Sequence, residues 1–305
     1  MVAWSNYGQI DLISDLHVDR WPDHPLDWHK LACSPIAVVA GDVSDSIAQT
    51  MQELGRIAQA YQQVLFVHGN HEFEASFSTA SLAEWSILQQ QLSQEIAYMD
   101  NVHFLPDRPV IIGDVAFIGQ YLGWDYRLGE PYIHAWQSFE YIREFLTEYH
   151  NLEHSVDFLT DLGNMAVGEA LILWQDLQQC EENQAVNSVV MITHTLPRKE
   201  LISWWEYPSN PLAAGIYGNS HMHDLLTEAS VPSKLKLCLF GHNHKQQNKL
   251  LDGVRYISNP RGRPADFNRV EYAPLTIDMR NMASAALSLQ PVILPKVKPL
   301  RLRSF

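Results

Sequence analysis

The chain has 305 residues, of which 46% are hydrophobic, and a formal net charge of −14. This length and apolar content are sufficient for one large folded domain and exclude an intrinsically disordered chain. The acidic balance disfavours a protein that wraps long nucleic acid, because such affinity depends on cationic side chains that meet phosphates. It leaves open a nucleotide bound at a locally positive site.

The cysteines and the apolar runs indicate the compartment. Cys33, Cys180 and Cys238 are far apart and form no CxxC pair, so we interpret them as small buried apolar residues of a reducing compartment. The sequence shows no leader-type segment, and no apolar run is long enough to span a bilayer. We therefore expect a cytoplasmic protein without a membrane partner.

The first part of the chain predicts alternating strands and helices. Short β-branched runs at 10–14, 36–40 and 64–68 are typical of buried strands. Between the second and third runs, apolar residues recur at helical spacing from Ile47 to Tyr61. Ser81 with Glu84 forms the pattern of a capping box and predicts a helix that reaches Ile96.

Hairpins and further helices are predicted next. Gly113-Asp114 lies between runs 110–112 and 115–118, and Asp252-Gly253 lies within 250–258; both pairs are typical of tight turns. Helical spacing returns at 139–149 and 171–177, and apolar runs at 189–193, 235–240 and 275–279 predict strands. A βαβ-type start that merges into hairpins predicts an α/β domain with mixed sheets and helices outside them.

Five short motifs rich in metal-ligating side chains follow predicted strands. They are Asp15-Leu16-His17, Gly41-Asp42, Gly69-Asn70-His71, His194 and Gly241-His242-Asn243-His244. Each alone is a weak signal, because a strand-end histidine is more often structural and a Gly-Asp pair is usually a turn. Together they occupy the strand ends where open α/β folds place ligand sites. In an extended segment, residues two apart point the same way, so we expect Asp15 with His17, and His242 with His244, to address one point.

The ligand set is chemically uniform. It comprises two carboxylates, one amide oxygen and four imidazoles, without a thiolate, and it suits Mn, Fe or Zn. The set offers more ligands than one ion needs, so we expect two ions. Two divalent ions with Asp15, Asp42 and a bridging hydroxide would leave net positive charge, which a phosphate ester requires.

The motif order D-x-H, GD, GNH, H and GHxH resembles that of the calcineurin-like metallophosphoesterases, from Ile10 to about Phe267. The resemblance implies a four-layer α/β/β/α sandwich with mixed sheets and a dinuclear metal site at the strand ends. It also implies two ligand sets that share Asp42 as a bridge, namely Asp15, His17, Asp42 and His244 for one ion, and Asp42, Asn70, His194 and His242 for the other.

The resemblance also implies catalytic roles. His71 matches the histidine that contacts the scissile phosphate and helps the leaving group, and Asp45 matches the acidic residue that orients it. Ser46 stands where the phosphoprotein phosphatases of the superfamily carry an arginine, so one phosphate clamp is missing. Glu72 replaces the aspartate that follows GNH in many members.

We predict a single domain over residues 1–290, with a C-terminal tail over 291–305. Segments of about 73–109, 123–165 and 197–230 are richer in helical patterning than the core requires, and we interpret them as insertions able to surround the metals. Trp204, Trp205 and Tyr207 in the third segment are candidates to stack on a base, although aromatic clusters more often serve packing.

The predicted activity is hydrolysis of a phosphomonoester or phosphodiester of a small, nucleotide-like substrate by a metal-bridging hydroxide. The alternatives are a Ser/Thr phosphoprotein phosphatase, a nuclease, and a non-catalytic protein-binding scaffold. Arg198, Lys199 and Arg261 are candidate phosphate clamps, for which a solvated surface is the favoured interpretation. His221 and His223 are predicted to diverge on a helix and not to form a metal pair. The sequence gives no oligomeric state.

Overall fold

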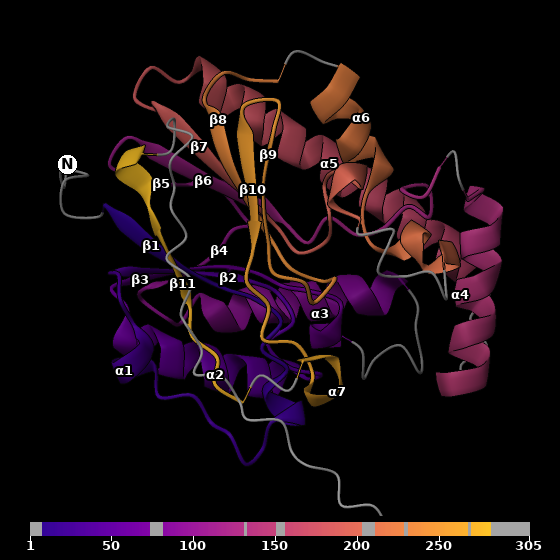
Figure 1. The fold of residues 1–305 in the computed structure, drawn as a ribbon, viewed down its shortest axis with the longest axis horizontal. Coiled ribbons are helices and arrows are strands. Elements are labelled where there is room, and N and C mark those ends of the chain that lie inside the picture. The colour runs from indigo at the N-terminus through magenta and orange to yellow at the C-terminus, as the bar shows by residue number, and fades with distance from the viewer. Residues whose placement is uncertain are drawn as a thin grey trace, which may run out of the picture.

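The computed structural model describes residues 8–73, 82–130, 133–150, 156–202, 211–228, 231–267 and 270–281. Two β-sheets pack face to face within this part of the chain, and helices cover the outer side of each sheet (Figure 1). The fold is therefore the predicted four-layer α/β/β/α sandwich with two mixed sheets.

The first sheet contains five strands in the order β11-β1-β2-β3-β4. Strands β1 (Gln9–Ile13), β2 (Ile36–Ala40), β3 (Gln63–Val67) and β4 (Val102–Phe104) are parallel, and β11 (Leu275–Asp278) is antiparallel to β1. Helices α1 (Trp28–Leu31), α2 (Ile47–Ala60) and α3 (Leu82–Ile96) belong to this half of the sandwich. Ser46 begins α2 as its N-cap, because its side chain accepts a hydrogen bond from the Gln49 amide at 3.3 Å.

The second sheet contains six strands in the order β5-β6-β7-β8-β10-β9. Its strands are β5 (Val110–Ile112), β6 (Val115–Gln120), β7 (Ser188–Thr193), β8 (Leu235–Phe240), β9 (Gln247–Leu251) and β10 (Val254–Ser258). The pairs β5–β6 and β9–β10 are antiparallel, which confirms both predicted hairpins. Helices α5 (Val156–Glu182) and α6 (Ser220–Glu228) cover this sheet, and α4 (Ala135–His150) lies farther out beside the 3-10 helix η6 (Pro211–Ile216).

The alternation of side chains along the strands divides the core into layers. Leu12 and Val38 lie between the two sheets, with Val190 and Leu239 of the second sheet in the same cluster. Their neighbour Ile13 instead packs on the helix side of the first sheet. Successive strand residues point to opposite faces, so an unbroken apolar run is what a sheet covered on both sides requires.

Three expectations from the sequence need correction or qualification. The segment 73–109 contains β4, the edge strand of the first sheet, and α3 packs near it, so this part completes a core layer. Cys33 is exposed, whereas Cys180 and Cys238 are buried as predicted. Ser81 and the tail 291–305 lie outside the described residues. Within the described part, no helix is long and apolar enough to cross a membrane.

Glu169 of α5 links the helix to the loop that follows β6. Its buried carboxyl is expected to make the stability of the fold depend on pH. Its Oε2 atom accepts a hydrogen bond from the Gly123 amide at 2.8 Å. Burial nevertheless raises the pKa of Glu169 from its ordinary 4.5 to about 7. The folded state therefore binds the proton of the Glu169 carboxyl more tightly than the unfolded state does. The stability that this proton contributes is complete below pH 4.5 and is lost as the pH rises through about 7.

We therefore compare the free energy of unfolding of the Glu169→Gln variant with that of the natural protein. The difference between them should shift in favour of the variant as the pH rises from 5 to 8, by about 3 kcal/mol at most. Urea unfolding of both proteins at the two pH values measures this difference. An equal difference at both pH values would show that Glu169 is ionised throughout.

Candidate metal centre

The five predicted motifs lie in loops that follow β1, β2, β3, β7 and β8, and these strands come from both sheets. The structure brings their side chains to one place. Ligand-type atoms of Asp15, His17, Asp42 and His244 lie within 4.8 Å of one another, as do those of Asp42, His194 and His242. Asp42 belongs to both groups, as the resemblance implies for a bridging residue.

The backbone at these residues is unusual. Asp15, His17, Asp42, His242 and His244 all have positive φ, from 43° to 71°. Non-glycine residues rarely adopt this region, and such strain is concentrated at functional sites. The expected reason for convergence, an extended segment whose alternate side chains point the same way, is therefore wrong. Each of these five candidate ligands is turned individually by a left-handed backbone.

Two glycines next to the ligands are required by close packing. A Cβ atom on Gly69 would lie 2.1 Å from Asp42 Oδ1, and one on Gly241 would lie 2.5 Å from Asp15 Oδ2. Neither distance is possible for a side chain. Glycine therefore stands in GNH and GHxH because the neighbouring carboxylate occupies the space that a side chain would fill.

Three histidines are oriented by acceptors outside the cluster. His194 Nδ1 donates to the Ala40 carbonyl at 2.9 Å, His242 Nε2 to the Ile216 carbonyl at 2.8 Å, and His244 Nδ1 to Asp266 Oδ2 at 2.5 Å. These acceptors hold the ring proton on the outer nitrogen, so the inner nitrogen directs a lone pair at the other ligands.

The inner atoms face one another as acceptors. His194 Nε2 lies 3.2 Å from Asp42 Oδ2 and 3.3 Å from Asn70 Oδ1, and His242 Nδ1 lies 3.1 Å from the same Asn70 oxygen. In the other group, His17 Nε2 and His244 Nε2 are 2.9 Å apart. Lone pairs at these distances repel unless a proton or a cation lies between them. The residues present therefore fit metal ions.

The electrostatics of the cluster also favour a cation. Burial opposes ionisation of Asp42, but the surrounding His194 and His71 outweigh it and hold its pKa well below the usual range. Burial likewise lowers the pKa of His194, yet Asp42 outweighs it and raises that pKa to about 9. Burial lowers the pKa of His242 to about 3, so this ring is neutral. The negative charge that attracts a proton to His194 attracts a metal ion equally, so protons and metal compete here.

His71 lies beside the cluster with its predicted partner. Its Nδ1 atom donates to Asp45 Oδ1 at 2.9 Å, and its Nε2 atom lies 3.9 Å from Asp42 Oδ2. Arg20 of η2 (Val18–Arg20) forms an ion pair with Asp45. The contact with His71 outweighs burial of the Asp45 carboxyl and lowers its pKa. The predicted orienting contact between Asp45 and His71 is present.

Several residues support the cluster in ways that the sequence did not predict. Glu72 is buried and accepts hydrogen bonds from the amides of Val43 at 2.7 Å and Gly69 at 2.6 Å, which joins two ligand loops. The Trp124 ring stacks on His242 with a centroid distance of 5.7 Å. Ile216, whose carbonyl accepts the hydrogen bond from His242 Nε2, belongs to the predicted insertion 197–230. Carbonyl and packing partners of this kind leave no motif in a sequence.

The candidate phosphate clamps proposed from the sequence are not among the clustered residues. Arg198 is buried and forms ion pairs at 2.9 Å with both Glu200 and Asp252, so the favoured interpretation as a solvated side chain is wrong for it. Lys199 is exposed. His221 and His223 lie on α6, as predicted. Trp204, Trp205 and Tyr207 lie outside the described residues.

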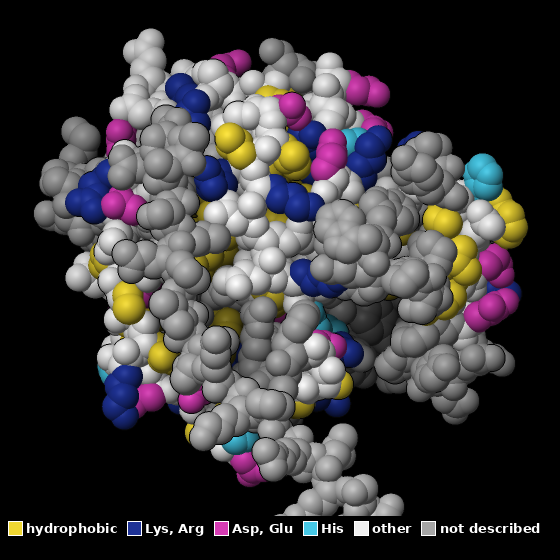
Figure 2. All heavy atoms as spheres, in the orientation of Figure 1, with side chains coloured by type: hydrophobic (Ala, Val, Ile, Leu, Met, Phe, Trp, Pro, Cys, Tyr) yellow, Lys and Arg dark blue, Asp and Glu magenta, His cyan; other side chains and the backbone are white. Residues whose placement is uncertain are grey.

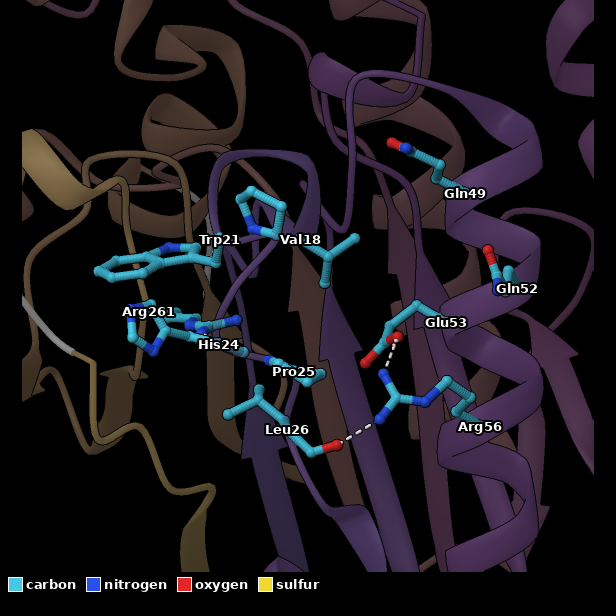
Figure 3. A pocket seen from close by; sticks show the side chains of 11 residues that line it. Val18, Trp21, His24, Pro25, Leu26, Gln49, Gln52, Glu53, Arg56 and Arg261 are labelled. Atoms are coloured by element: carbon cyan, nitrogen blue, oxygen red, sulfur yellow. Dashed lines mark hydrogen bonds and ion pairs between the residues drawn. The ribbon is translucent and has the colours of Figure 1, made fainter.

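Arg261 is also buried, under Trp21 at the wall of a separate cavity of about 310 Å³ (Figure 3). Its guanidinium lies 4.7 Å from the Trp21 ring centroid and donates to the His24 carbonyl at 2.7 Å. Across the cavity, α2 presents Glu53 and Arg56, which form an ion pair at 2.6 Å. Arg261 therefore anchors the segment after β1 and is neither solvated nor among the candidate ligands.

Figure 2 shows histidine, acidic and basic side chains close together, below and right of the centre of the view.

Comparison with known proteins agrees with this geometry. The family model of the calcineurin-like phosphoesterases matches residues 8–246. No curated protein sequence matches the chain. The solved structure of a phosphopantetheinyl hydrolase from Mycobacterium tuberculosis is similar in fold, with a TM-score of 0.66 and 18% identity over 87% of this chain and 93% of that one.

A candidate 5′-nucleotidase from Staphylococcus aureus shares 13% identity, with a TM-score of 0.40 over 83% of this chain and 49% of that one. That likeness is too distant to support an argument. The family match covers more than half of the sequence, and the clustered histidines and aspartates supply groups that bind metal. The chain belongs to the calcineurin-like phosphoesterase family and is a metal-dependent hydrolase of phosphoric esters.

Proposed function

We propose that the protein hydrolyses a phosphomonoester or phosphodiester bond in a small phosphorylated molecule, with two ions of Mn, Fe or Zn held by the seven clustered residues. One observation carries the proposal. His71, held by Asp45, lies beside two ligand groups that share Asp42, and this arrangement combines a metal centre with a proton donor. A structural metal site needs no such donor.

The clustered residues would have two roles, metal binding and proton donation. When bound, the ions would activate a water for attack on phosphorus and offset the charge that builds on the phosphoryl oxygens. Asp15, His17, Asp42 and His244 would hold one ion, and Asp42, Asn70, His194 and His242 the other. His71 would donate a proton through Nε2 to the oxygen that leaves phosphorus, while Asp45 holds Nδ1 and stabilises the charged ring.

Three features support a small substrate over a phosphoprotein or a duplex. Ser46 caps α2 and supplies no positive charge, unlike the arginine of the phosphoprotein enzymes. The segment 197–230 reaches the centre through the carbonyl of Ile216, so at least this predicted insertion walls one side of it. A walled centre admits a small or flexible ester more readily than a flat protein surface. The net charge of −14 also disfavours a long polyanion.

The test is metal analysis together with a substrate panel. We expect purified protein loaded with Mn to retain close to two ions per chain and to hydrolyse aryl phosphates, mononucleotides and small diesters. Phosphopeptides and double-stranded DNA should be far poorer substrates in kcat/KM. Protein that retains one ion or none would contradict the dinuclear centre, and metal-loaded protein inactive on every ester would support the scaffold alternative.

A further inference from the structure

Arg263 is a cation at the proposed active centre that the motif pattern does not include. It lies between β10 and α7 (Pro264–Phe267), far along the chain from the loop that carries His71. Its Nη2 atom nevertheless lies 2.5 Å from His71 Nε2. This is the ring nitrogen that, under the proposed function, faces the leaving oxygen. The guanidinium therefore occupies the position that a scissile phosphate would approach.

The guanidinium of Arg263 has no direct ion pair within the described residues, although Asp45 and Asp266 lie near enough for its charge to contribute to lowering their pKa values. No carboxylate there forms an ion pair with its guanidinium, and its Nε atom is buried without a hydrogen-bond partner. Asp266, the nearest acidic neighbour in sequence, accepts from the Arg263 backbone amide at 2.8 Å and from His244 at 2.5 Å. A guanidinium has five N–H donors, and the structure engages one of its nitrogens. Such a group favours an anion.

The backbone before Arg263 is fixed to the first metal group. The Arg261 amide donates to the Ser14 carbonyl at 3.0 Å, and the Gly262 amide donates to the Asp15 carbonyl at 2.9 Å. The Gly262 carbonyl in turn accepts from Trp21 Nε1 at 2.8 Å. The backbone that carries Arg263 is therefore set relative to Asp15, which is itself a candidate ligand, and the guanidinium contacts His71 from there. A preorganised donor of this kind binds an anion without ordering a loop.

We infer that Arg263 binds the non-bridging oxygens of the scissile phosphate, a role that rests on the proposed function. Before substrate binds, Arg263 donates to His71 Nε2. When the incoming phosphate takes this donor, Nε2 is free to take up from solvent the proton that it later passes to the leaving oxygen. The guanidinium thereby supplies, from the segment after β10, the positive charge that Ser46 does not supply from the loop after β2. Because it adds a full charge, it favours a phosphomonoester with two negative charges over a diester with one.

The test measures phosphate affinity and turnover separately. The variants are Arg263→Gln, which removes the charge, and Arg263→Lys, which keeps the charge but loses the planar fork. Arg280→Gln is the matched control, because Arg280 is exposed and pairs with Asp278. Inorganic phosphate is titrated into each manganese-loaded protein by calorimetry, and metal content is determined on the same samples.

We expect Arg263→Gln to weaken phosphate binding by roughly 10- to 100-fold with metal content unchanged, since charge-assisted bidentate contacts are strong. The phosphate affinity of Arg263→Lys should lie between those of Arg263→Gln and the natural protein. The affinity of Arg280→Gln should match that of the natural protein. For turnover, kcat/KM for 4-nitrophenyl phosphate should fall further than that for bis(4-nitrophenyl) phosphate. Phosphate affinity within twofold of the natural protein would overturn the assignment, as would loss of metal in Arg263→Gln.

The calorimetric measurement distinguishes this inference from the proposed function. If the metal-loaded natural protein binds phosphate through Arg263 but hydrolyses no ester, the clamp stands and the catalytic proposal fails. If esters are hydrolysed and Arg263→Gln changes neither phosphate affinity nor the ratio between the two esters, the clamp fails alone.

Discussion

Replacing Asp42 with Asn should remove metal and activity together. Asp42 is the residue shared by both ligand groups, and its Oδ2 atom lies 3.2 Å from His194 Nε2 and 3.8 Å from His17 Nε2. Asn offers one neutral oxygen in place of two that share a negative charge, so both ions lose a charged ligand. We expect less than one ion to remain per chain and kcat/KM to fall by roughly 10³-fold or more.

The measurement is elemental analysis after desalting, with activity toward an aryl phosphate on the same sample. Asp100→Asn is the matched control, because Asp100 is exposed after α3, and far-UV circular dichroism verifies folding. An Asp42→Asn variant that keeps two ions and more than a tenth of the activity would show that Asp42 does not bridge. Since Oδ1 of Asp42 also accepts the His71 amide at 2.9 Å, a modest loss of stability is expected as well.

Replacing His71 with Asn should instead separate catalysis from metal binding. His71 contacts Asp45 through Nδ1 and Arg263 through Nε2, and we assign it no ion. Metal content should therefore remain close to that of the natural protein, while kcat falls by roughly 10²-fold or more through loss of a proton donor. The loss should grow with the pKa of the leaving alcohol, because a poor leaving group depends more on protonation.

A series of aryl and alkyl phosphates measures this dependence. The exposed His134 provides the control variant, His134→Asn, for which we expect unchanged rates. Equal losses for nitrophenyl and alkyl esters would contradict proton donation by His71. Loss of metal in His71→Asn would place this residue among the ligands instead. Asp45→Asn should show the same pattern as His71→Asn with a smaller effect, because Asp45 acts through His71.

The sequence by itself determined the layers and the candidate ligands. Runs such as Ile36–Ala40 are apolar at every position, which is the pattern of a strand in a sheet that is covered on both faces. Hairpin turns were equally local, since Gly113 and Asp252-Gly253 adopt the positive φ that such turns demand. The seven candidate ligands could be named because each follows a strand in a compact motif, and the capacity to bind metal depends on residue type.

Only the tertiary structure decided how those residues meet and what surrounds them. Asp15 and His242 converge through left-handed backbone that is maintained by contacts between loops, for example from the His242 amide to Asp15 Oδ1 at 2.7 Å. Arg263 contacts His71, and Arg198 forms an ion pair with Asp252, although the partners are far apart in the sequence. Such pairs have no periodicity or spacing in the sequence, because the sheets that bring them together form from contacts distributed over the whole chain. Whether an arginine is a solvated side chain, a buried ion pair or a cation without a direct ion pair is therefore set by packing.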